Sequence, residues 1–330
     1  MLVLLHGSGD DDSKPENWMP HVAAMMQFHG DLALVLPGVG SEAHAEAKDK
    51  GIDFCRRLKV RWERAGRPAT KALACTPSGT LHDALSAGVN LEALRGFRGS
   101  LDFDTAAELI ASLDQKEESS WAMSGNGIKF RATVAGICAI LYEGYLPDDE
   151  NKVPLRIVGH SRGGCAAITA HNLCTYWGLT PRTLVLDPCH GVVSLRENKL
   201  HWHNVWGGNV VNIPVMKNVG DARFDVTKRL PVTAHPDGNA TVTNHDKLPD
   251  IKHGHMGKLK NFSDAEKTAG RADLQGRIHP FLVNVARQAQ KKAETPRNHL
   301  QSFYETFATS TPDRDFIWER LKDTIAFARA

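Results

Sequence analysis

The sequence has 330 residues, of which 42% are hydrophobic and 24% are charged, and its net charge is +2. These values are typical of a globular protein with a sizeable core, and the length fits one large α/β domain or two ordinary ones. The small net charge, with no basic stripe between aromatic residues, argues against nucleic acid as a partner. No apolar run reaches the roughly 18 residues that a transmembrane helix needs.

The first residues and the cysteines indicate the compartment of synthesis. Residues 1–5 are apolar and run straight into His6-Gly7 without a basic region or a cleavage site, which predicts a core strand and not a signal peptide. The cysteines show no C-x-x-C spacing and several lie in apolar runs, so we expect reduced, buried thiols. We therefore expect synthesis in the cytoplasm without a cleaved signal, which allows export by a specialised secretion system. The six are Cys55, Cys75, Cys138, Cys165, Cys174 and Cys189.

Short apolar runs alternate with helical patterns along much of the chain. Helical patterns cover Ile128–Tyr145 and Gly163–Trp177. Alternation of this kind predicts an α/β fold with a doubly wound, mainly parallel sheet, and we interpret residues 1–330 as a single domain. The runs with the composition of buried parallel strands are Leu2–Leu5, Leu32–Leu36, Leu155–Val158, Thr183–Leu186 and Val210–Met216.

Two segments do not follow this alternation. Residues 43–120 are charged and rich in helical patterns, and Thr105 with Glu108 reads as a capping box for a helix that ends near Leu113. We interpret this stretch as a helical insertion that forms either a cap or lid over the site or a peripheral decoration. Residues 258–330 are predicted to form C-terminal helices that pack on the core.

The segment Val158–Gly164, with the sequence V-G-H-S-R-G-G, lies between a predicted strand and a predicted helix. Gly-x-Ser-x-Gly in this position is the pattern of a nucleophile elbow. Gly159 and Gly163 flank Ser161 because such a strained turn leaves no room for β-carbons beside the nucleophile. We therefore predict Ser161 as the nucleophile, and the backbone N–H of Arg162, at the helix N-terminus, as an oxyanion donor.

A serine nucleophile needs a base, and the base needs an acid that orients it. Asp187 follows the predicted strand Thr183–Leu186, at the edge where open α/β sheets place functional groups. Asp221 is the next candidate for the acid and Asp225 lies just beyond it, both after the following strand. The alternative role of Asp187 is to cap an Asp-Pro turn, which is common at strand ends.

The base is expected last in chain order. The segment Ile251–Gly257 reads I-K-H-G-H-M-G, and its glycines let a turn present an imidazole toward the strand edge. His253 is the first candidate and His255 the alternate, while a surface or hydrogen-bonded structural role is the ordinary one for any single histidine.

The predicted strand Leu2–Leu5 leads into the glycine-rich loop His6-Gly-Ser-Gly9. A second oxyanion donor usually comes from the loop after an early strand, so the N–H of Gly7 or Ser8 is expected to serve, unless the loop is an ordinary tight turn.

Some residue patterns could suggest a metal or a nucleotide. His201 with His203, His253 with His255, and the run Asp10–Asp12 offer nitrogen or oxygen ligands, but none belongs to a complete ligand set. The glycines near residue 38 are too sparse for a dinucleotide fingerprint. We expect neither a metal nor a cofactor.

With these residues in place, the chain resembles the α/β-hydrolase lipases. The motifs from G-H-S-R-G-G to V-L-D-P resemble the pancreatic-lipase arrangement, in which the acid follows the strand directly after the nucleophile strand. The chain also resembles the phospholipase-like effectors of bacterial type VI secretion, with Ser161–Gly163, His6–Gly9 and Pro37–Gly40 as counterparts of their motifs. The resemblance covers about residues 1–42 and 124–257. It departs where the family has a late P-G-x-H run, because this chain has I-K-H-G-H there.

The resemblance implies a Ser161–His253–Asp187 triad, a lipid or other ester as substrate, contact with a membrane surface, and a cognate inhibitor protein as a partner. Two other functions compete with a secreted lipase or phospholipase. One is an esterase, thioesterase or peptidase with a soluble substrate, and the other is a non-catalytic binding module on the same fold. An exposed apolar lid would favour a lipid substrate, and the amphipathic set Leu109, Ile110 and Leu113 points that way.

Overall fold

The computed structural model describes the elements that carry the predicted sheet and most of the predicted site. The described residues are 1–13, 17, 19–20, 22–23, 32–67, 85, 89, 102–115, 125–145, 154–189, 203–214, 231–245 and 253–256. Asp221, Asp225, Cys75, His201 and the predicted C-terminal helices of 258–330 lie outside them.

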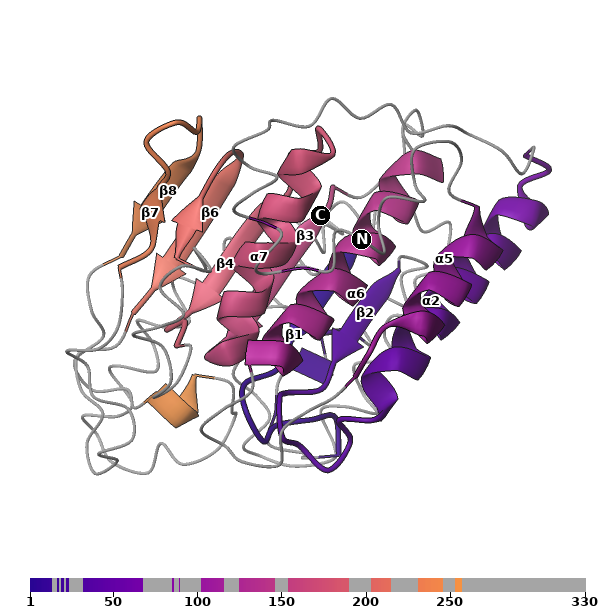
Figure 1. The fold of residues 1–330 in the computed structure, drawn as a ribbon, viewed down its shortest axis with the longest axis horizontal. Helices are drawn as coiled ribbons and strands as arrows, with labels where there is room; N and C mark the ends of the chain where they lie inside the picture. Colours follow the sequence, from indigo (N-terminus) through magenta and orange to yellow (C-terminus); the bar gives the residue numbers. More distant parts are fainter. Residues whose placement is uncertain are drawn as a thin grey trace, which may run out of the picture.

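A six-stranded parallel sheet forms the centre of the molecule, in the order β2-β1-β3-β4-β6-β8 (Figure 1). The expectation of an α/β fold with a mainly parallel sheet is confirmed, and the five predicted strands all form with bounds that shift by up to three residues. The sixth strand, β8, was not predicted. The strands are β1 (Leu2–Leu5), β2 (Ala33–Leu36), β3 (Arg156–His160), β4 (Arg182–Leu186), β6 (Asn209–Ile213) and β8 (Thr241–Asn244). A separate pair joins β5 (Asn204–Val205) to β7 (Thr233–Ala234).

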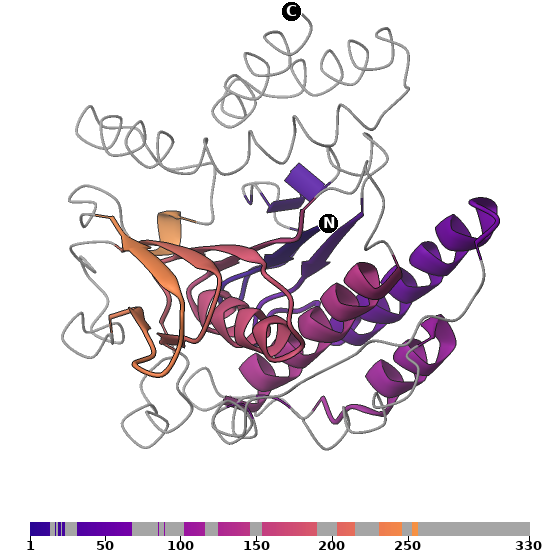
Figure 2. The ribbon, with the colours of Figure 1, turned by 90° about the horizontal axis from the view of Figure 1, so that it is seen from above.

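The four long helices in the described residues lie on one face of this sheet (Figure 2). Helix α7 (Arg162–Tyr176) packs on β3 and β4, α6 (Gly125–Tyr145) packs beside α7, and α2 (Glu46–Arg64) packs beside α6 and on β2. Helix α5 (Phe103–Ser112) packs against α2 and α6. Among the described helices, none combines the length and the apolar character needed to cross a bilayer.

Small residues allow α6 and α7 to approach closely. A Cβ at Gly136 of α6 would lie 2.3 Å from the Cδ2 of Leu173 on α7. Both helices are buried along nearly their whole described length. The five cysteines in the described residues are also buried and form no disulfide bond with one another.

Helix α5 begins one turn earlier than predicted. Its N-cap is Asp102, whose carboxylate accepts a hydrogen bond from the Thr105 N–H at 2.7 Å, so the predicted capping box at Thr105 is wrong. Phe103 explains the earlier start, because its ring is buried against Tyr145 with the ring centroids 3.9 Å apart. Burial of an aromatic pair outweighs the small difference between two good capping residues.

The described parts of the insertion belong to the core. Phe54 and Leu58 of α2 are fully buried, as is Ile110 of α5. Leu113 is 4% exposed and Leu109 is partly buried against the same core, so these residues form no exposed lid surface. The expectation that α5 presents an apolar face for lipid is wrong, because α2 and α6 already cover that face.

Helix α7 is tied to the loop before β6 by Asn172. Its side-chain amide donates to the Asn204 carbonyl at 2.8 Å, and its side-chain oxygen accepts from the Trp206 N–H at 3.1 Å. The side chain is almost fully buried, with 4% exposure.

We predict that Asn172→Ala lowers the free energy of unfolding by roughly 2 kcal/mol, because it leaves the buried Trp206 N–H and the part-buried Asn204 carbonyl without their partner. Urea denaturation followed by circular dichroism measures the change. Ser112→Ala, which removes a hydroxyl at the exposed end of α5, is the matched control and should change stability by less than about 0.5 kcal/mol. Equal effects of the two substitutions would contradict the anchoring role of Asn172.

Candidate active site

The candidate site lies at the point in the sheet where the strand order reverses. From β1 the chain goes first to β2 on one side, and later to β3, β4, β6 and β8 on the other. The carboxyl ends of parallel strands at such a switch point are where ligands bind in open α/β sheets. The loop after β1 carries Gly7, and the turn after β3 carries Ser161. The two are adjacent, since a Cβ at Gly7 would lie 3.3 Å from the Cβ of Ser161.

Ser161 occupies a strained turn between β3 and α7. Its φ of 56° and ψ of −124° lie in a region that non-glycine residues rarely adopt. The turn is held on both sides: the Ser161 N–H donates to the Leu186 carbonyl at 3.1 Å, and the Ser161 carbonyl accepts from the Gly164 N–H at 2.9 Å. The surrounding structure therefore maintains a conformation that the chain would otherwise avoid.

The two flanking glycines are required by close packing. A Cβ at Gly159 would lie 2.2 Å from the Gly163 carbonyl oxygen, and one at Gly163 would lie 2.2 Å from the Leu5 carbonyl oxygen. Both neighbours are backbone atoms, which cannot move aside as a side chain can. The sequence expectation that β-carbons have no room beside Ser161 is confirmed.

Asp187 and His253 meet Ser161 at this edge. The Nδ1–H of His253 donates to Asp187 Oδ2 at 2.5 Å, and its Nε2 lies 2.8 Å from Ser161 Oγ. All three residues are buried. Because a carboxylate only accepts, the proton of the neutral imidazole is on Nδ1, and Nε2 is left to accept the serine hydroxyl. This is the order of contacts by which a base activates a serine.

The two partners of Ser161 come from different elements of the fold. Asp187 follows β4 with a φ of 45°, a left-handed conformation that aspartate tolerates better than most residues. Its N–H donates to the Ile213 carbonyl of β6 at 2.9 Å. His253 begins the short 3₁₀ turn η5 (His253–His255). The side chain of His255, the alternative base, and Asp221, the alternative acid, lie outside the described part of the structure.

The predicted oxyanion donors lie around Ser161. Within the described residues, the N–H groups of Gly7 and Ser8 take part in no hydrogen bond. Arg162 is the first residue of α7, where the N–H groups point out of the helix N-terminus. The β1 loop and the helix N-terminus therefore both present backbone donors beside Ser161.

His160 connects His253 to the β1 loop, a role that was not predicted from the sequence. Its Nε2–H donates to the carbonyl of His253 at 2.8 Å, and a Cβ at Gly7 would lie 2.6 Å from its Nδ1. Burial lowers the pKa of His160 to about 3, with nearby His253 adding to the effect. The ring therefore stays neutral and keeps its proton on Nε2. The only available sequence signal was its place directly before Ser161.

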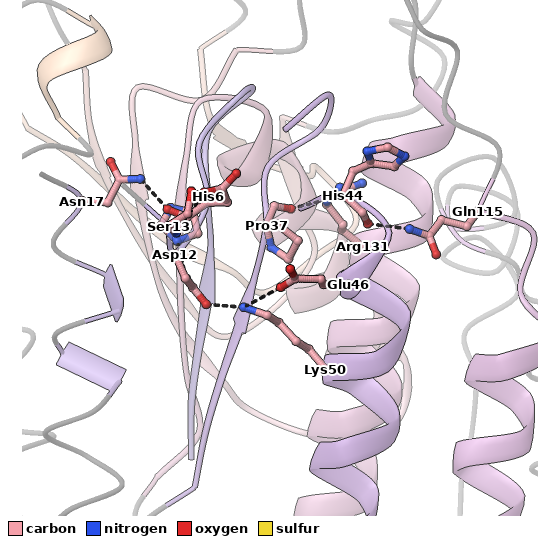
Figure 3. A network of polar contacts seen from close by, with 11 residues as sticks. His6, Asp12, Ser13, Asn17, Pro37, His44, Glu46, Lys50, Gln115 and Arg131 are labelled. Carbon is pink, nitrogen blue, oxygen red and sulfur yellow. Dashed lines mark hydrogen bonds and ion pairs between the residues drawn. The ribbon is translucent and has the colours of Figure 1, made fainter. Parts of the chain in front are cut away.

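A second polar network braces the outer side of the β1 loop (Figure 3). His6 Nε2 lies 3.0 Å from Asp12 Oδ1, and Lys50 of α2 donates to the other oxygen of Asp12. Burial alone would raise the pKa of Asp12, but the hydrogen bonds from His6 and Lys50 outweigh it and lower the pKa. The loop is thus connected to α2 by an ionic contact.

The described residues contain no group of three or more histidine, cysteine or acidic side chains placed to hold a metal ion. In the run Asp10–Asp12, the Asp12 carboxylate contacts His6 and Lys50, and the Asp11 carboxylate accepts from Ser13. Two of the three aspartates therefore make hydrogen bonds or ion pairs that hold the β1 loop in place.

Comparison with known proteins adds no relative: no known protein family, curated protein or solved structure matches this chain. The described residues define an α/β protein in which a buried serine, histidine and aspartate meet at the carboxyl edge of a parallel sheet.

We predict that His160→Gln flattens the pH dependence of stability. In the unfolded chain a histidine titrates near pH 6.5, whereas in the folded protein the pKa of His160 is about 3. Between these values the unfolded state holds one more proton at this residue, so stability falls as the pH falls. The slope contributed is about 1.4 kcal/mol per pH unit, and the substitution removes it.

Urea denaturation at several values between about pH 4 and pH 6 measures this slope, and glutamine keeps an N–H that can reach the His253 carbonyl. Parallel stability curves for the two proteins would contradict a buried, neutral His160.

Proposed function

We propose that the protein is a serine hydrolase of carboxylic esters, with a fold of the α/β-hydrolase type. The observation that carries the proposal is His253, whose two ring nitrogens contact Asp187 at 2.5 Å and Ser161 at 2.8 Å. A purely structural histidine needs partners for its ring, but it does not need a serine held at a strained turn beside a helix N-terminus. The combination supports nucleophilic catalysis over the non-catalytic binding module.

The proposed reaction follows from these contacts. Ser161 Oγ attacks the acyl carbonyl while its proton passes to His253 Nε2, and Asp187 stabilises the imidazolium that forms. The N–H groups of Ser8 or Gly7 and of Arg162 stabilise the negative charge on the carbonyl oxygen. His253 then gives the proton to the leaving alcohol, and a water molecule activated by the same base releases the acid and regenerates Ser161.

We further propose that the substrate is a lipid or phospholipid, and that the protein is an exported effector with a cognate inhibitor. These finer proposals rest on the sequence resemblance alone. The apolar residues of α5 give them no support, because these residues belong to the core and form no exposed surface for lipid. A small soluble ester or thioester is the alternative substrate, and the same triad would act on it unchanged.

We predict that Ser161→Ala lowers ester hydrolysis by a factor on the order of 10⁶ and keeps the fold, since the variant loses the nucleophile and adds no bulk. Hydrolysis of p-nitrophenyl esters with short and long acyl chains, and of phospholipid vesicles, measures the activity. A fluorophosphonate probe is expected to label the parent protein on Ser161. Retention of more than about a tenth of the activity would contradict the proposal.

The same substrates distinguish the two substrate classes. Faster turnover of long-chain esters and vesicles supports a lipid substrate. Preference for acetyl or butyryl esters, without release of fatty acid from vesicles, supports the soluble alternative.

We predict that Asp187→Asn lowers kcat by about 10⁴, because an amide favours the tautomer of His253 that cannot accept the serine proton. Asp221→Asn is the matched comparison, and we expect it to change kcat by less than about tenfold. If Asp221→Asn were the more damaging change, the acid would come from the later segment, and the serine mechanism would still stand.

A further inference from the structure

A buried arginine lies behind the β1 loop. Arg131 of α6 is 1% exposed, and its guanidinium donates to the carbonyl of Pro37 (Figure 3). It also donates to the carbonyl of Gly38, at 3.0 Å. A third contact, at 3.2 Å, goes to the Gly127 carbonyl of its own helix. The side chain therefore fixes two consecutive peptide groups of the loop after β2.

The loop after β2 in turn fixes the loop after β1. The Gly38 N–H donates to the Asp10 carbonyl at 2.7 Å, and the Asp10 N–H donates to the Gly7 carbonyl at 3.1 Å. The backbones touch as well, since a Cβ at Gly38 would lie 1.7 Å from the Gly7 carbonyl oxygen. The Gly7 carbonyl belongs to the peptide group whose N–H is that of Ser8, so this chain of contacts sets the direction of that N–H.

We infer that Arg131 is a positioning residue for the oxyanion hole, acting through Pro37, Gly38 and Asp10 on the Ser8 N–H. The inference rests on the proposed function and adds a residue that never touches the substrate. A donor stabilises an oxyanion only if it already points at the place where the charge develops. The short path from Arg131 to Ser8 supplies this preorganisation.

Arginine suits the position better than lysine. The planar guanidinium carries five N–H donors in a fixed geometry, which allows it to hold the Pro37 and Gly38 carbonyls at the same time. An ammonium is a compact charge on a flexible stem and holds one orientation less firmly. The charge matters too, because hydrogen bonds from an ionised donor are stronger and polarise the peptide groups behind them.

The test compares Arg131→Met and Arg131→Lys with Arg156→Met in the full-length protein. Arg156 is also buried, with 3% exposure, but it begins β3 at the opposite edge of the sheet from Ser161. We expect Arg131→Met to lower kcat by on the order of 10²-fold, as for loss of one oxyanion donor, with KM within about threefold of the parent value. Arg131→Lys should lose part of this factor, and Arg156→Met should keep kcat even where its Tm falls.

An alkylboronic acid gives a readout that a general loss of stability would not produce. Its boron accepts an electron pair from Ser161 Oγ, the serine proton passes to His253, and one boronate oxygen occupies the oxyanion hole. Its affinity should fall by about the same factor as kcat, because both depend on a donor aimed at that oxygen. Amide hydrogen exchange in residues 6–12 should become faster in both Arg131 variants, while exchange in α7 stays unchanged.

The outcomes separate the two levels of the proposal. If the parent protein neither hydrolyses esters nor reacts with the fluorophosphonate probe, the proposed function fails. If the parent is active and the Arg131 variants keep kcat and boronate affinity, or lose them only as Arg156→Met does, the inference about Arg131 is wrong. Should Arg131→Met not fold, Arg131→Lys alone decides, by its boronate affinity and its exchange in residues 6–12.

Discussion

The close approach of α7 to β1 at Gly163 is the constraint on which the site depends. The backbone there leaves 2.2 Å between a Cβ added at Gly163 and the Leu5 carbonyl oxygen, so the helix can begin directly beside the end of β1. Ser161 is then forced into its strained turn, because the chain must change from strand to helix within one residue. Backbone hydrogen bonds to β4 and to the first turn of α7 hold Ser161 in this conformation. Relaxing the strained turn would break these bonds, and the free energy lost would offset the strain released.

A neutral histidine and two cations hold the loops around this turn. His160, with a pKa of about 3, stays an uncharged donor to the loop that carries His253. Arg131 and Lys50 hold the loops after β2 and β1 from the other side, through carbonyls and through Asp12. The segment that begins at His253 is thus held by His160 of β3, and the loop with the proposed oxyanion donors is held by residues of α2 and α6. The serine lies where the two frameworks meet.

Prediction from the sequence succeeded where a residue pattern has one physical meaning. A buried parallel strand must be an uninterrupted apolar run, so β1 to β4 and β6 were identified from composition, with bounds that shift at the ends. Strand β8 was missed because it is a polar, exposed edge strand of the sequence T-V-T-N. The start of α5 was misplaced because Asp102 and Thr105 both cap well, and the burial of Phe103 decides between them.

The sequence by itself determined the strand, turn and helix around Ser161, the order of the candidate partners along the chain and the need for glycine around the serine. It ranked His253 before His255 and Asp187 before Asp221, but residues of the same type carry the same chemistry, so the sequence could not show which of them meet Ser161. Tertiary structure brought His253 within 2.8 Å of Ser161 and gave Arg131 and His160 their contacts. The physical reason is distance along the chain: Arg131 meets Gly38 and His160 meets His253 only once the parallel strands have aligned their ends at a common edge.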